Sequence, residues 1–170
     1  MNLSSSKMMW WSPTLHNVHC AKSLFQQRLH SLTLPNELVP EVKHLGLVLL
    51  AGDLHELRTL ISTYDGCEHE LSLIVDLVNE VLQDKLRIDV IAFEHPEHGR
   101  IVNALSIGLT GEKKQLVVGT QMELEVFHFN RDSRTLFNSE PEIECKSVFR
   151  RLSTALIAEL TPPLKPAVSW

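Results

Sequence analysis

Histidine and cysteine are the residues of this chain that could do chemistry, with nine histidines and three cysteines among 170 residues. Seven of these residues lie in three groups of near neighbours in the sequence: His16, His19 and Cys20; Cys67 and His69; His95 and His98. A zinc site needs about four such ligands in tetrahedral geometry. No Cys-x-x-Cys or His-Glu-x-x-His is present, and His95-Pro96-Glu97 matches only half of a zinc deaminase signature. We therefore predict no metal site.

The segment after residue 93 contains several titratable side chains and lies at a predicted strand end, where a ligand could bind. Its titratable residues are Glu94, His95, Glu97 and His98. It follows a predicted parallel strand over residues 87–93, and ligands in open α/β sheets bind beyond the carboxyl ends of such strands. These side chains suit proton transfer. The alternative is a polar loop whose carboxylates favour the amino end of a following helix.

Gly52-Asp53 occupies the matching position after an apolar run at residues 45–51. A nucleotide site there would need a glycine-rich loop, and this one contains a single glycine. Asp53 would also repel phosphate. We therefore predict no nucleotide cofactor, and keep Asp53 and His55 only as further candidates for a ligand site with residues 94–98.

No nucleophile is predicted either. Cys67 lies next to Glu68 and near Glu70, whereas an activated thiolate needs positive surroundings. A Gly-x-Ser-x-Gly sequence is absent. We treat the cysteines as reduced thiols and predict no catalytic residue.

The elements that would position these side chains suggest an α/β fold. Apolar runs at residues 45–51, 87–93 and 115–119 indicate buried strands, and helical patterns separate them. The helical patterns cover residues 21–32, 53–64, 69–83, a segment after Pro96, and a last helix from about Cys145 to Pro162. Asp53 fits an N-cap with Glu56 three residues on. The helix at 69–83 has an unusually wide apolar face, which predicts deep burial or a partner.

An antiparallel hairpin is predicted at residues 122–137. Alternation over 122–126 breaks where Phe127 follows Val126, which indicates a bulge or a strand end. The predicted fold is one three-layer α/β domain over residues 21–161. It has a mixed, mostly parallel sheet, helices on both faces and this C-terminal hairpin. Residues 1–20 and 162–170 are predicted to be an irregular tail and an extended tail.

The N-terminal tail carries an apolar cluster, Met8, Met9, Trp10 and Trp11. Tryptophan and methionine are enriched in interface anchors. The cluster either fills a groove on its own domain or docks on a partner protein.

Composition narrows the classes of partner. The net charge is −5 and no lysine or arginine block is present, which argues against a broad nucleic-acid contact. Arg131, Arg134, Arg150 and Arg151 leave room for a small basic patch. Three widely spaced cysteines favour a reducing, cytoplasmic location, and no segment has the ~20 apolar residues of a membrane span.

These observations predict a non-catalytic protein–protein interaction protein, an adaptor or accessory subunit, docking through the tail at residues 8–11. The alternative is a small ligand- or metal-binding enzyme that uses Asp53 and the loop Glu94–His98.

Overall fold

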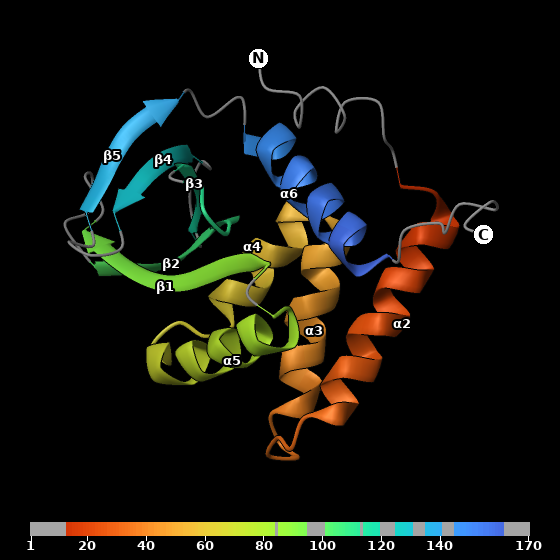
Figure 1. Ribbon diagram of the computed structural model, residues 1–170. Helices are drawn as coiled ribbons and strands as arrows, with labels where there is room; N and C mark the ends of the chain where they lie inside the picture. Colours follow the sequence, from red (N-terminus) through yellow and green to blue (C-terminus); the bar gives the residue numbers. More distant parts are fainter. Residues whose placement is uncertain are drawn as a thin grey trace.

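The computed structural model describes residues 13–83, 85–94, 101–112, 114–119, 125–130, 135–140 and 145–161 (Figure 1). The helices are α2 (Leu15–Ser31), α3 (Val39–Ala51), α4 (Leu54–Ser62), α5 (Glu68–Val81) and α6 (Cys145–Leu160). The strands are β1 (Leu86–Glu94), β2 (Ile101–Leu109), β3 (Lys114–Gly119), β4 (Glu125–Asn130) and β5 (Thr135–Glu140). None of the described helices combines the length and apolar composition needed to cross a bilayer.

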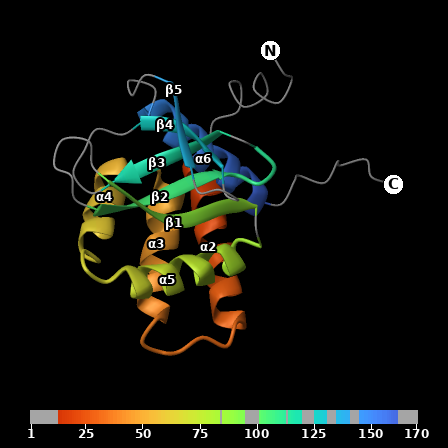
Figure 2. The ribbon, with the colours of Figure 1, turned by 90° about the vertical axis from the view of Figure 1, so that its left-hand side faces the viewer.

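The sheet corrects the predicted fold class. Each described strand pairs with the next in antiparallel fashion, in the order β1-β2-β3-β4-β5. Four helices precede the strands and one follows them, so helices and strands do not alternate along the described chain. The prediction of a mixed, mostly parallel sheet in a three-layer sandwich is therefore wrong. Figures 1 and 2 show a curved sheet, with the helices gathered on one side of it.

The first wrong strand is the apolar run at residues 45–51, which lies in α3. A short run of continuous apolar residues does not distinguish a buried strand from a buried helix. Here the helix is enclosed by its neighbours. Leu45, Leu49 and Leu50 are fully buried in the core, and Gly46 lets the Phe25 ring of α2 pack directly on the α3 backbone. Gly52 ends the helix in the left-handed conformation that glycine favours.

The second wrong element is the helix expected after Pro96, because residues 101–109 form strand β2. Leu105 and Ile107 alternate with Ala104, Ser106 and Gly108, which is the period of a strand. Leu105 and Ile107 join the core shared with the helices. Ala104 and Ser106 belong to the other face, which is buried as well. Burial on both faces explains why polar alternation was too weak to reveal the strand.

Several other predictions are confirmed. Asp53 caps α4, its carboxylate accepting a hydrogen bond from the Glu56 backbone N–H at 3.1 Å. Helices α5 and α6 and strands β1 and β3 lie where the patterns placed them. The predicted hairpin forms from β4 and β5, and its register shifts between Val126 and Phe127, as the broken alternation indicated.

Helix α2 starts earlier than predicted. It begins at Leu15, so the boundary drawn at residue 20 between tail and domain falls inside a helix. The missed signal is the capping box at its start. The Asn17 backbone N–H donates to Thr14 Oγ1 at 3.1 Å, and the Thr14 backbone N–H donates to Asn17 Oδ1 at 3.0 Å.

The core joins the helices to one face of the sheet. Helix α5 packs along β1, and α2 packs against α3 and α6. Asn79 of α5 is buried, and its side chain makes two hydrogen bonds with the Ile88 backbone of β1, donating to the carbonyl at 2.7 Å and accepting from the N–H at 3.0 Å. Ser153 of α6 donates to the Leu49 carbonyl of α3 at 2.7 Å. These bonds fix the helices relative to one another and to the sheet.

Candidate functional site

The structure removes the reason for a ligand site at strand ends. Asp53 lies between two helices, where its carboxylate serves as the cap of α4. Glu94 ends β1, and the connection that follows leads into an antiparallel partner strand. The site was predicted because carboxyl ends of parallel strands share one edge of a sheet, and this sheet has no such strands among its described pairs. His95, Glu97 and His98 lie outside the described residues.

The tail cluster Met8, Met9, Trp10 and Trp11 also lies outside the described residues. Its docking on a partner or on its own domain therefore stays a prediction. The described chain begins just after this segment, at Pro13, and Thr14 caps the start of α2.

Helix α2 is held on its inner side by the core. Ala21, Phe25 and Leu29 recur at helical spacing and are at most 1% exposed. The Phe25 ring lies against Gly46 so closely that a methyl group at position 46 would overlap it. The opposite side of α2 is therefore presented to solvent in a fixed orientation.

That outer side of α2 carries no permanently charged residue. Its exposed residues are Leu15, His16, His19, Ser23, Gln27, His30 and Ser31, which we call the α2 face. Leu15 is 75% exposed, the largest value among the exposed large hydrophobic residues of the described chain. The basic residues of the helix, Lys22 and Arg28, are half-buried, and the helix contains no aspartate or glutamate.

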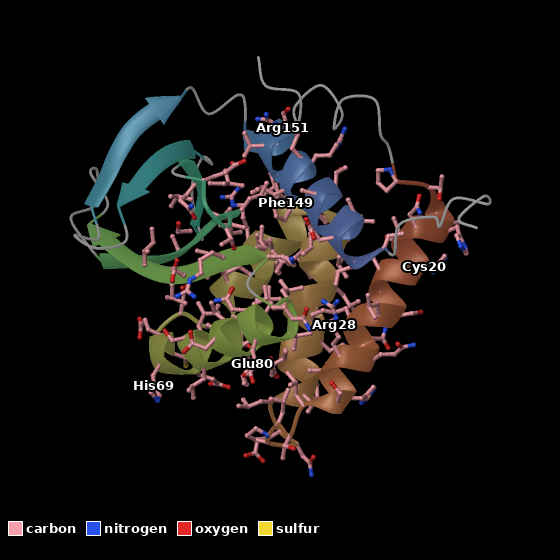
Figure 3. All side chains as sticks on the ribbon, in the orientation of Figure 1. Cys20, Arg28, His69, Glu80, Phe149 and Arg151 are labelled. Carbon is pink, nitrogen blue, oxygen red and sulfur yellow. The ribbon has the colours of Figure 1, made fainter. Side chains whose placement is uncertain are left out.

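The other helices expose charge. The exposed residues of α5, here called the α5 face, are Glu68, His69, Glu70, Leu73, Asp76 and Glu80. The first half of α6 exposes Lys146, Arg150 and Arg151. In Figure 3, Cys20 on α2, His69 on α5 and Arg151 on α6 lie at three different sides of the molecule. A helix face without fixed charge is thus a feature of α2 that α5 and α6 do not share.

The wide apolar pattern of α5 predicted either deep burial of this helix or contact with a partner. Leu71, Ile74 and Val78 are at most 1% exposed, so the core accounts for most of that pattern. Leu73 remains 43% exposed, surrounded on the helix by carboxylates. The apolar excess that suggested a partner on this helix is therefore reduced to one exposed leucine.

Cysteine and histidine come together at one place on the described surface. The Cys20 Sγ and His16 Nε2 atoms, one helical turn apart on α2, are 3.4 Å apart. Cys67 is exposed at the start of α5, where it precedes His69. Within the described part of the chain, no three histidine, cysteine, aspartate or glutamate side chains converge as a metal site would require.

A buried tyrosine forms the remaining notable polar contact. Tyr64 lies in the turn before α5, and its hydroxyl donates a hydrogen bond to the Glu41 carboxylate at the start of α3. Burial raises the pKa of the Tyr64 phenol well above its usual value, and the neighbouring Glu41 and Glu70 carboxylates raise it further. The hydrogen bond therefore joins the turn before α5 to the start of α3, and the raised pKa keeps the phenol neutral at physiological pH.

Comparison with protein-family models, with curated proteins and with solved structures finds no match for this chain.

Proposed function

We propose that this chain is a non-catalytic interaction protein, an adaptor or accessory subunit, that docks on another protein through the α2 face and the adjoining residues 8–11. The observation that carries the proposal is the absence of fixed charge on the exposed side of α2. Charged residues are depleted in the centres of protein interfaces, because removing an unpaired charge from water is costly.

The exposed leucine supports the same surface. Leu15 is the first residue of α2 and is 75% exposed. In the sequence it comes four residues after Trp11, the last residue of the apolar cluster. Large apolar side chains that are contiguous on a surface mark contact sites more often than scattered ones do. The leucine and the cluster would together form the apolar centre of the interface.

The compartment is also a proposal. Cys20 and Cys67 are free thiols, and Cys67 is exposed. Free thiols at the surface persist in reducing compartments, which supports a cytoplasmic protein.

The test compares two leucines that are both exposed on helices. The chain would be tagged in its native cell and purified with its partners, as wild type, as Leu15→Asp and as Leu73→Asp. An aspartate in the first turn of a helix interacts favourably with the helix dipole, so Leu15→Asp should not unfold α2. We expect Leu15→Asp to lose the principal partner and Leu73→Asp to retain it. Equal retention by both variants would contradict the proposal.

Deletion of residues 1–12 tests the tail separately. We expect the shortened chain to lose the same partner while its melting temperature changes little. A large fall in melting temperature would instead place the tail on its own domain.

A further inference from the structure

His16 and Cys20 form a pair of metal-ligating side chains on an exposed helix. They are separated by one helical turn, which places both on the same side of α2. Their ligating atoms, Nε2 of His16 and Sγ of Cys20, are 3.4 Å apart. His16 lies on the α2 face, and Cys20 lies half-buried at its margin.

The separation of these atoms fits a tetrahedral metal site. With zinc–sulfur and zinc–nitrogen bonds of about 2.3 and 2.0–2.1 Å, tetrahedral angles place a sulfur and a nitrogen ligand about 3.6 Å apart. The pair on α2 is within a few tenths of an ångström of that value. The two atoms are therefore already near the separation that a shared zinc ion would impose.

The pair supplies only two of the four ligands that zinc requires. No third histidine, cysteine or carboxylate joins it among the described residues. A second copy of the chain would present the same two ligands, and a two-fold axis between two α2 helices would complete a site of two imidazoles and two thiolates. Zinc held by two thiolates and two neutral imidazoles carries no net charge.

The α2 face allows such an approach of two copies. Two molecules of net charge −5 repel each other overall. Facing α2 helices would nevertheless bring together exposed side chains that carry no fixed charge.

We propose that His16 and Cys20 are half of a zinc site and that two copies of the chain complete it across their α2 helices. This rests on the proposed use of the α2 face as an interaction surface and commits to a second copy of the chain as its occupant. Each Cys20 thiol loses its proton when zinc binds, so two protons are released per metal ion and no electron is transferred.

Zinc titration of the full chain tests the proposal. Metal-free protein, kept reduced with a phosphine, would be titrated with Zn²⁺ while its mass is followed by sedimentation velocity. We expect a dimer that forms at one zinc per two chains and dissociates with a chelator. With Co²⁺ in place of zinc, we expect thiolate-to-cobalt charge-transfer absorption together with the strong visible bands of tetrahedral cobalt.

Three variants separate the proposed site from other histidines and cysteines. Cys20→Ser and His16→Ala should each weaken zinc affinity by at least about 100-fold and abolish the dimer, since even residues behind the ligands change affinity by about 10–100-fold. His30→Ala, on the same face of α2 but outside the pair, should change neither. A chain that stays monomeric at saturating zinc, a dimer that resists chelator but dissociates on stronger reduction, or equal losses in Cys20→Ser and His30→Ala would each overturn the proposal.

Failure here would differ from failure of the proposed function. If zinc produces no dimer but Leu15→Asp still loses the cellular partner, the interaction surface stands and only its second-copy occupant is wrong.

Discussion

Helices α2 and α5 have similar buried sides, but their exposed sides differ in charge. Each sends a regular apolar stripe into the same core, with Phe25 at the centre of one and Leu71 in the other. The exposed residues of α5 include four carboxylates, whereas those of α2 include no fixed charge. The core therefore explains the inner sides of both helices, and only the outer sides separate a solvated helix from one suited to contact with a protein.

The largest effect on stability is expected from truncating the buried side of α2. Phe25→Ala should lower the free energy of unfolding by about 3–5 kcal/mol, because a fully buried ring leaves a cavity beside Gly46. Leu71→Ala on α5 should cost about 2–5 kcal/mol for the same reason. Urea denaturation measures both. A change below about 1 kcal/mol in either variant would contradict the equal role given to the two helices in the core.

A smaller effect is expected from the polar contact that is specific to α5. Asn79→Ala should destabilise the chain by about 1–3 kcal/mol, because the Ile88 backbone N–H and carbonyl lose the hydrogen bonds that Asn79 supplies. Asp76→Ala, exposed on the same helix, is the control and should stay within about 0.5 kcal/mol. Thermal unfolding of the two variants would decide, and equal melting temperatures would contradict the role given to Asn79.

The stability of the chain should depend on pH through Tyr64, which lies in the turn before α5. The folded chain holds the Tyr64 phenol neutral above the pH at which the unfolded chain ionises it, near 10. The unfolded state therefore binds fewer protons in this range, and stability falls as pH rises. The loss should reach about 1.4 kcal/mol at pH 11.

Tyr64→Phe is the control for this titration. It should remove the tyrosine contribution to that slope, at the expense of the hydrogen bond to Glu41 at neutral pH. Since Tyr64 is the only tyrosine in the chain, tyrosinate absorbance reports its ionisation directly. Ionisation near pH 10 in the folded protein would contradict the raised pKa.

The smallest effect on stability should come from the outer sides themselves. Ser23→Glu, in the middle of the α2 face, should change the free energy of unfolding by no more than about 0.5 kcal/mol. It should nevertheless abolish partner capture, because it places an unpaired carboxylate in the contact. Glu80→Gln on α5 should leave both properties unchanged. If Ser23→Glu still captured the partner, the proposal that the uncharged α2 face is the binding surface would be contradicted.

The sequence predicted elements whose patterns differ clearly between helix and strand. Asp53 with Glu56 marked the start of α4, and adjacent Val126 and Phe127 marked the register shift in the hairpin. Residues 45–51 and 101–109 were assigned to the wrong class because most of residues 45–51 and all of residues 104–108 are buried, so neither segment shows a clear polar face that would set the period. These two errors turned an antiparallel sheet into a parallel one.

The candidate site followed the fold. The predicted site placed Asp53 and Glu94 at the same edge of a parallel sheet, and the structure contains no such sheet among its described strands. The α2 face was missed because the helix was started at residue 21, beyond both His16 and Cys20. The capping box of Thr14 and Asn17 was the available signal. The approach of His16 Nε2 to Cys20 Sγ at 3.4 Å depends on the rotamers of the two side chains, which the sequence spacing alone does not specify.

The bond pair between Asn79 and Ile88 has a consequence for aggregation. Strand β1 is a border of the sheet, and a border strand offers its backbone to any extended chain that meets it. The Asn79 amide already occupies the backbone donor and acceptor of Ile88, close to the start of β1. An added strand would have to displace this buried side chain before it could pair with Ile88, which disfavours extension of the sheet at this part of β1.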